Sequence, residues 1–221
     1  KELAFTSYRS GNPDLLRMEV YSGREARISS RKGLNIAGRY RPPDGGELAL
    51  TTSEDGNADI FIIGIDGRIS RRVTNSWGID VDPSWSPDGR RLAFVSDRLG
   101  NPQIFVVDAQ GGQERRITQA GSYNATPAWS PDGERIAFSR LEGGRFDIYT
   151  IRSDGSDERR LTFGAGSKEH PRWSPDGRFL VYSSTQGGKR EIFAMRADGS
   201  GSRRISSAAG NSFHPAWSVR W

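Results

Sequence analysis

The pentapeptide Trp-Ser-Pro-Asp-Gly recurs every 44 residues, and this period constrains the fold more than any other feature of the chain. Copies begin at Trp85, Trp129 and Trp173, and a degenerate copy begins at Trp217. An earlier copy at residues 40–45 has Tyr in place of Trp and one extra residue in the turn. Periods of roughly 20–50 residues indicate solenoids or propellers, in which each repeat forms one supersecondary unit.

Each repeat contains three further short runs of apolar and β-branched residues in the same register. In the repeat that begins at Trp85 they are Leu92-Ala93-Phe94, Ile104-Phe105 and Arg116-Ile117-Thr118. Runs of this kind, bounded by Gly, Pro, Asp and Ser, are typical of strands of about five residues. A helical repeat would need apolar residues at a spacing of about 3.6. Four strands per repeat predict a propeller blade.

We therefore predict an all-β fold, a five-bladed β-propeller of four-stranded antiparallel blades in one domain, residues 1–221. The chain opens with the second-strand run Leu3-Ala4-Phe5 and ends with the first-strand run Pro215-Ala216-Trp217. Because the two ends complement each other, we expect residues 214–221 to close the ring by pairing with the N-terminal blade. The repeats fall at about 1–39, 40–84, 85–128, 129–172 and 173–213.

The Pro-Asp-Gly segments are predicted to form the turns between the first and second strands of each blade. Pro presets the backbone for a turn, Asp bonds the backbone ahead of it, and Gly accepts the positive φ that a tight hairpin requires. The aspartates of this motif are therefore expected to have a structural task.

The chain is basic, with 32 Lys and Arg against 27 Asp and Glu, but the charge is distributed evenly. Nucleic-acid binding needs the charge gathered on one face, and we do not expect it here. No stretch approaches the roughly 18–20 apolar residues of a membrane span. Cys is absent, which excludes disulfides and thiolate metal sites. Eight of the arginines form regularly spaced pairs: Arg71-Arg72, Arg115-Arg116, Arg159-Arg160 and Arg203-Arg204.

These residues resemble the repeat of the TolB β-propeller family. The shared order is Pro-x-Trp-Ser-Pro-Asp-Gly, then Leu-Ala-Phe-x-Ser, then Ile-Phe or Ile-Tyr, then Arg-Arg-Ile-Thr, and it extends over essentially the whole chain. The resemblance implies a periplasmic protein-binding module of the Tol–Pal system, which maintains the outer membrane of Gram-negative bacteria during division. It implies the peptidoglycan-associated lipoprotein Pal as the partner.

Two departures from the family pattern matter. We count five repeats where the family's propellers have six, and the α/β domain that precedes the propeller in TolB has no counterpart in this sequence. Contacts that depend on that domain, such as those with TolA, are therefore not carried over. We expect a monomer.

In the family pattern, contacts with Pal come from the residues just before Pro-x-Trp. The matching positions here vary between repeats while their flanks recur, so the fold does not require one particular side chain there. Loops on a rigid scaffold often carry function, although merely tolerant loop positions would vary in the same way. The predicted contact residues are Asn35, Ile36, Asp80, Val81, Asp82, Asn124, Ala125, Lys168, Glu169, His170 and His214.

We assign no metal, cofactor or catalytic role to these residues. The two histidines lie 44 residues apart on successive blades, and Asp80 with Asp82 offers few of the roughly six oxygen ligands that a hard cation usually takes. The sequence has no Gly-x-Ser-x-Gly elbow, phosphate-binding loop or His-Glu-x-x-His helix. The prediction is a binding module that is not an enzyme. Two alternatives stay open: an engineered or truncated propeller scaffold without a native partner, and a propeller-type hydrolase or lyase.

Overall fold

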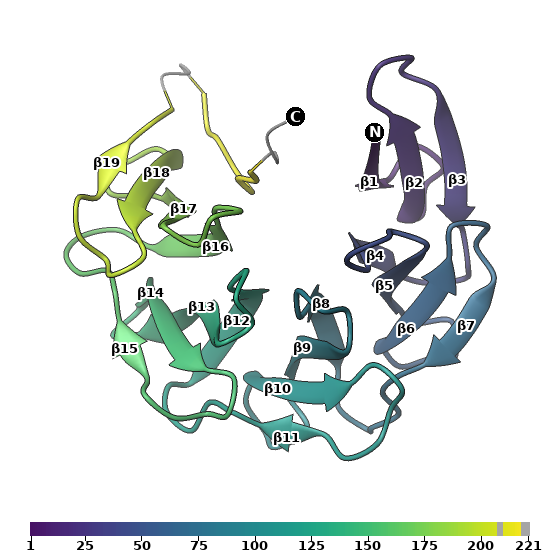
Figure 1. The fold of residues 1–221 in the computed structure, drawn as a ribbon, viewed down its shortest axis with the longest axis horizontal. Coiled ribbons are helices and arrows are strands. Elements are labelled where there is room, and N and C mark those ends of the chain that lie inside the picture. Colours follow the sequence, from purple (N-terminus) through teal and green to yellow (C-terminus); the bar gives the residue numbers. More distant parts are fainter. Residues whose placement is uncertain (207–209, 218–221) are drawn as a thin grey trace. The chain divides into compact units, whose positions relative to one another are not determined.

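A computed structural model of the chain describes residues 1–206 and 210–217, and these residues form strands and turns without any helix (Figure 1). The strands belong to five consecutive sheets, in which each strand pairs with the next along the chain. By internal contacts the chain divides into two compact units, residues 1–100 with 106–115 and residues 101–105 with 116–221. No helix in the described part of the chain is long and apolar enough to cross a membrane.

The first unit contains two whole sheets and most of a third. The first sheet consists of β1 (Glu2–Ser7), β2 (Asp14–Glu19) and β3 (Glu25–Ser29). The second consists of β4 (Asn35–Tyr40), β5 (Glu47–Thr52), β6 (Asp59–Gly64) and β7 (Ile69–Arg72). The third consists of β8 (Asp80–Trp85), β9 (Arg91–Ser96), β10 (Gln103–Asp108) and β11 (Arg115–Arg116), and β10 and β11 have residues in both units.

The second unit contains the last two sheets. One consists of β12 (Tyr123–Trp129), β13 (Arg135–Glu142), β14 (Arg145–Arg152) and β15 (Arg159–Arg160). The other consists of β16 (Lys168–Trp173), β17 (Phe179–Ser184), β18 (Glu191–Arg196) and β19 (Arg203–Arg204). The pentapeptide and the three apolar runs of each repeat that begins at Trp85, Trp129 or Trp173 thus each overlap a strand. The predicted all-β propeller fold class is confirmed.

Neighbouring sheets within a unit are joined by apolar cores. In the first unit, buried side chains of the first two sheets pack together: Leu15, Ile28, Leu48, Leu50, Phe61 and Ile63. In the second unit the fourth and fifth sheets share an equivalent cluster: Ala137, Ile148, Leu161, Leu180, Tyr182 and Met195. Most of these residues recur at the repeat period, so the repeated apolar positions of the sequence are the positions that form the core.

The Pro-Asp-Gly turns have the predicted geometry. In the third sheet the Ser86 hydroxyl donates to Asp88 Oδ1 at 2.6 Å, and the same oxygen accepts the Arg90 N–H at 3.1 Å. The Ser86 hydrogen bond holds the pKa of Asp88 below its usual range. Gly89 has φ +67°, and a Cβ there would lie 2.2 Å from the Pro42 carbonyl oxygen. Glycine is therefore required both by the turn and by the close approach of the second sheet.

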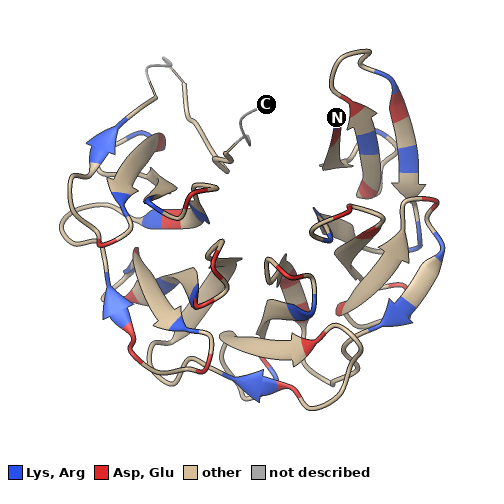
Figure 2. Cartoon of the chain, viewed as in Figure 1, with Lys and Arg blue, Asp and Glu red and all other residues tan. Residues whose placement is uncertain are grey.

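The paired arginines lie on the short fourth strands, where Figure 2 shows basic residues on β7, β11, β15 and β19. In three repeats the second arginine binds an acidic residue at or near the start of the third strand. Arg72 lies 2.6 Å from Asp59, Arg160 lies 2.7 Å from Asp147, and Arg204 lies 2.8 Å from Glu191. These ion pairs therefore link the fourth, edge strand of the blade to the third strand.

Ring closure stays a prediction. The first sheet has three strands, and residues 210–217 carry no strand assignment. The remainder of the predicted closing strand, residues 218–221, lies outside the described residues. The expectation of a single domain likewise stays a prediction, since the contacts define two compact units.

Candidate functional site

The predicted contact residues lie in five equivalent tripeptides, residues 35–37, 80–82, 124–126, 168–170 and 212–214, which we call the rim segments. The first two belong to the first compact unit and the other three to the second. Four of them begin or lie near the beginning of a first strand, β4, β8, β12 or β16. In each of these strands the pairing register with the second strand shifts just after the segment, which marks a β-bulge.

The third residue of every rim segment has left-handed backbone geometry. The φ angles are +58° at Ala37, +55° at Asp82, +53° at Thr126, +60° at His170 and +47° at His214. Non-glycine residues adopt this region at a cost of about 1–2 kcal/mol, and Asp and His are enriched there. The conformation recurs at all five positions although four different residue types occupy them, so it belongs to the backbone of the repeat and does not depend on one side chain. It displays a variable side chain from a fixed backbone.

The first residue of the rim segments is buried in four repeats, which the sequence prediction did not anticipate. Asn35, Asp80 and Asn124 are fully buried and Lys168 is 2% exposed. Their polar atoms bind the loop that enters the strand rather than solvent. Lys168 Nζ, for example, donates to the carbonyl oxygens of Phe163 and Gly164, each at 3.0 Å.

The buried anchor of the third sheet is the most strongly paired. Both oxygens of Asp80 accept from Arg98 Nη2, at 2.9 and 2.7 Å, and Ser76 donates to Asp80 at 3.3 Å. Arg98 also forms an ion pair with Glu114. In the second unit Asn124 has a similar task, because it donates to Gln103 Oε1 at 2.8 Å and accepts from Arg140. These buried side chains hold the backbone of the rim segments in place.

The second and third residues of the segments are the partly exposed ones. Ile36, Val81 and Asp82 are half-buried in the first unit. In the second unit Ala125, Glu169 and His170 are half-buried and His214 is exposed. Only these members of the predicted set reach the surface.

The structure brings the two histidines together. His170 Nε2 and His214 Nε2 lie 3.1 Å apart, and the rings meet edge to face at 86° with centroids 4.2 Å apart. Beside them Glu169 forms a 2.9 Å ion pair with Arg190, whose guanidinium lies 5.6 Å from the ring centre of Phe213. The sequence prediction did not include Arg190, and it did not bring the two histidines together. The available signal was the 44-residue spacing, which places equivalent positions of adjacent blades side by side.

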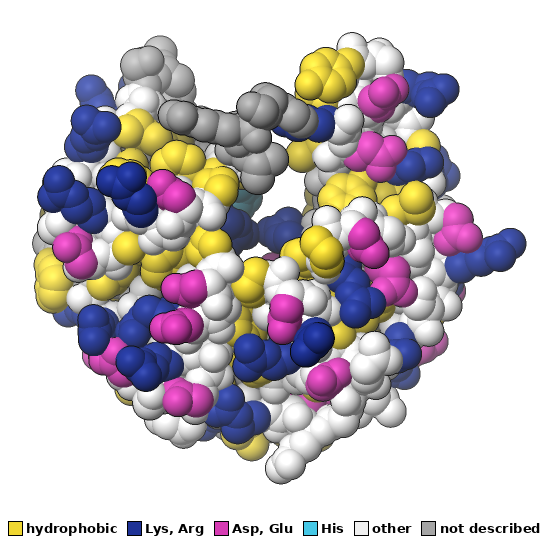
Figure 3. All heavy atoms as spheres, viewed as in Figure 1, with side chains coloured by type: hydrophobic (Ala, Val, Ile, Leu, Met, Phe, Trp, Pro, Cys, Tyr) yellow, Lys and Arg dark blue, Asp and Glu magenta, His cyan; other side chains and the backbone are white. Residues whose placement is uncertain are grey.

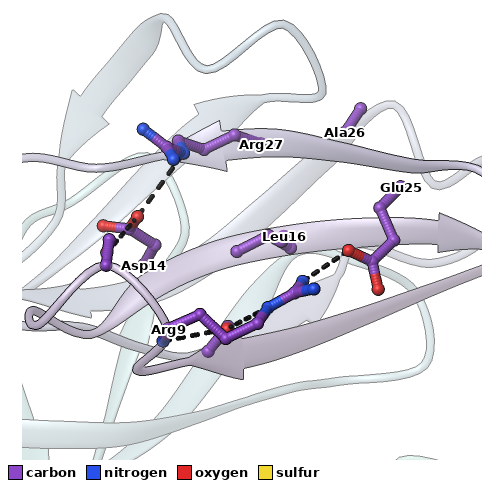
Figure 4. Close-up of a pocket in the computed structure, with 8 residues that line it drawn as sticks. Arg9, Asp14, Leu16, Glu25, Ala26 and Arg27 are labelled. Atoms are coloured by element: carbon purple, nitrogen blue, oxygen red, sulfur yellow. Dashed lines mark hydrogen bonds and ion pairs between the residues drawn. The ribbon is translucent and has the colours of Figure 1, made fainter.

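Among the described residues, hollows outside the rim segments lie on the first and the last sheet. A cavity of about 290 Å³ on the first sheet is lined by charges that pair with each other, Arg9 with Glu25 and Arg27 with Asp14 (Figure 4). A larger groove of about 1050 Å³ lies on the last sheet and includes Met195, Ile205 and Trp217. Figure 3 shows hydrophobic side chains gathered over this sheet.

The family model and the curated relatives identify one family. The model of the TolB beta propeller domain matches residues 1–221. A protein TolB homolog from Chlorobium luteolum is 44% identical over 84 residues, which are 38% of this chain and 19% of that protein. A Tol-Pal system protein TolB from Anaeromyxobacter dehalogenans is 40% identical over 85 residues, again 38% and 19%. The matched region is thus about a fifth of the length of these relatives.

A solved structure extends the similarity to the whole chain. The crystal structure of TolB from Acinetobacter baumannii superposes with a TM-score of 0.88 at 32% identity, and the match covers 98% of this chain and 54% of that one.

Proposed function

Because the chain belongs to the TolB β-propeller domain family, we propose that it is a periplasmic protein-binding module of the Tol–Pal system that binds the lipoprotein Pal. Curated relatives carry the Tol–Pal name, and the family resemblance supplies Pal as the partner. The proposal includes a role in binding without catalysis. The charged groups of the cavity on the first sheet are paired with each other, in keeping with such a role.

The observation that carries the proposal is the repeated rim geometry. Five segments share one left-handed backbone conformation, yet they present Ala37, Asp82, Thr126, His170 and His214. A fixed backbone with variable side chains is the arrangement that recognition surfaces use, because the positions are preorganised while the chemistry differs.

The exposed members define the proposed contact set. In the first unit these are Ile36, Val81 and Asp82, and in the second Ala125, Glu169, His170 and His214. The buried members of the predicted set act indirectly, by holding the loops in place. Asp80 is the clearest case, since Arg98 and Ser76 already occupy its oxygens.

The test is calorimetry with the soluble domain of Pal at up to roughly 100 µM, a range that detects micromolar affinity. We expect one-to-one binding. Asp82→Asn and His214→Asn should each weaken it about fivefold or more, the scale of an interface residue worth over 1 kcal/mol. Asn tolerates the left-handed conformation, so the backbone is preserved.

Glu134→Gln, at an exposed turn position away from the rim segments, is the control and should bind as the unmodified chain does. Absence of heat with the unmodified chain would overturn the partner assignment. Binding that neither rim variant weakens would overturn the assignment of the surface.

A further inference from the structure

The chain has only two histidines, and the fold places both at one point of the second unit. They occupy the same position of successive repeats, each immediately before a proline and each with left-handed φ. No other imidazole and no thiolate is present in the sequence to compete for a metal ion. This pairing is independent of whether Pal is the partner.

The distance between the two ring nitrogens suits a shared metal ion. With Zn–N bonds of about 2.0–2.1 Å, a tetrahedral ion holds two nitrogens roughly 3.3 Å apart. His170 Nε2 and His214 Nε2 are 3.1 Å apart. The ring centroids are 4.2 Å apart, about 1 Å closer than in two ligands of one tetrahedral ion with such bonds, so the exposed His214 ring has to turn outward slightly when the ion binds.

The surroundings of His170 fit a ligand role. Its Nδ1 lies 3.4 Å from the hydroxyl of Ser183, and that hydroxyl donates to the Glu169 carbonyl oxygen at 3.1 Å. The Ser183 oxygen also lies 3.5 Å from Arg190 Nη1, and its second lone pair can accept from Nδ1–H. Metal-bound histidines usually donate their second ring N–H to such an oxygen, which fixes the ring and leaves the other nitrogen for the metal.

We propose that His170 and His214 form a two-histidine site for a late divalent transition metal such as Zn²⁺ or Co²⁺, bound through both Nε2 atoms. Imidazole favours ions of this class over Ca²⁺ and Mg²⁺. No group of three or more His, Cys, Asp or Glu side chains in the described part of the chain is arranged to hold an ion. Water or a residue of a bound protein completes the coordination.

The experiment titrates the full chain with Zn²⁺ by calorimetry and with Co²⁺ by visible absorption, at about pH 7.5, above the ordinary pKa of imidazole. We expect one ion per chain and a Co²⁺ spectrum with nitrogen ligands. His170→Asn and His214→Asn should each reduce the affinity at least about tenfold. Both keep a residue that accepts left-handed φ, and circular dichroism checks their fold.

Ca²⁺ is the control ion. Any weak binding of Ca²⁺ should be the same in the unmodified chain and in both variants. The proposal is overturned if Zn²⁺ does not bind the unmodified chain at about 1 mM. It is also overturned if a variant with both substitutions, His170→Asn and His214→Asn, binds Zn²⁺ as tightly as the unmodified chain does. Either result would leave the pair as a histidine–histidine hydrogen bond. Because no Pal is present in the experiment, its outcome is separate from the test of the proposed function.

Discussion

The indole N–H of Trp217 donates to the carbonyl oxygen of Arg172 at 3.1 Å. One repeat earlier, Trp173 makes the same bond with Ala128, also at 3.1 Å, and in the first unit Trp85 bonds Arg39 at 2.9 Å. The segment that contains Trp217 has no strand assignment, yet its tryptophan docks on the last sheet as a first-strand tryptophan docks on the preceding blade.

This docking predicts that Trp217→Ala destabilises the protein. Trp217 is 39% exposed, so only part of its surface is buried, and we expect a loss of about 1–3 kcal/mol in the free energy of unfolding. Urea denaturation followed by circular dichroism measures it. Trp77→Ala is the matched control, because Trp77 is 79% exposed and should change stability by less than about 0.5 kcal/mol. Equal effects at the two positions would contradict the docked role of Trp217.

A second prediction separates the buried anchors from the contact residues. Asp80→Ala removes the fully buried carboxylate of this network and leaves the Arg98 guanidinium, which is 14% exposed, with Glu114 as its carboxylate partner. Because Glu114 still pairs with Arg98, the cost is that of buried donors that lose their acceptor, about 1–3 kcal/mol. The free energy of unfolding should fall accordingly. The comparison variant Asp66→Ala breaks an exposed 3.5 Å pair with Arg68 and should cost at most about 1 kcal/mol. A similar small loss in both variants would show that Asp80 is not an anchor.

The difference between Asp80 and Val81 also shows where sequence reasoning reached its limit. The repeat period located the strands, the Pro-Asp-Gly turns and the rim positions, because these depend on local residue types. The burial of individual rim-segment residues could not be predicted from the sequence, because the bulge between Val81 and Ser84 interrupts the alternation of inward and outward side chains. Asp80 therefore appeared to be a contact residue although it lies beneath the surface.

The 44-residue spacing of the two histidines was interpreted as keeping them apart, although it brings the two side chains together. His170 and His214 lie one repeat apart, and equivalent positions of adjacent blades are neighbours in a propeller. Whether two such side chains touch depends on their rotamers and on the left-handed backbone. The 44-residue period gives no information on the rotamers or on the backbone conformation. The ion pairs of the second arginines, such as Arg160 with Asp147, were missed for the same reason.

Asp157 supports a prediction about pH. Hydrogen bonds from Arg135 and then Arg159, at 2.8 and 2.9 Å, lower the pKa of Asp157 to about 2. The unfolded chain should titrate near about 3.9. A depressed folded pKa stabilises the protein above the unfolded value, and this contribution disappears as pH falls from about 4 toward 2. NMR titration of the carboxyl carbon should place the midpoint near 2. A midpoint close to the unfolded value would contradict these pairings.

The variant Asp157→Asn tests the same linkage through stability. Asn accepts the left-handed φ of +51° at this position, so the substitution removes the charge without straining the backbone. The variant should be less stable than the unmodified chain at pH 7, and the difference should vanish near pH 2. A difference that persists unchanged at pH 2 would point to a cause other than ionisation.

The repeat geometry predicts that a third histidine can be added to the proposed metal site. Thr126 precedes His170 by one repeat, as His170 precedes His214. The Thr126 hydroxyl lies 2.9 Å from Ser139 Oγ, which matches the contact of His170 Nδ1 with Ser183 one repeat later. A histidine at 126 should therefore place its Nε2 beside that of His170. Thr126→His is expected to tighten Zn²⁺ binding at least about tenfold, since structural zinc sites usually have four ligands and a third protein ligand replaces water.

Ser122→His provides the control for this gain, because Ser122 is exposed in the turn before β12 and adds an imidazole away from the pair. Competition against a chelator of known affinity measures both variants. Equal tightening in the two variants would mean that any added imidazole suffices, and no tightening in Thr126→His would mean that residues 126, 170 and 214 do not converge on one ion. The expected result, tightening only in Thr126→His, would extend the proposed site along the rim by one blade.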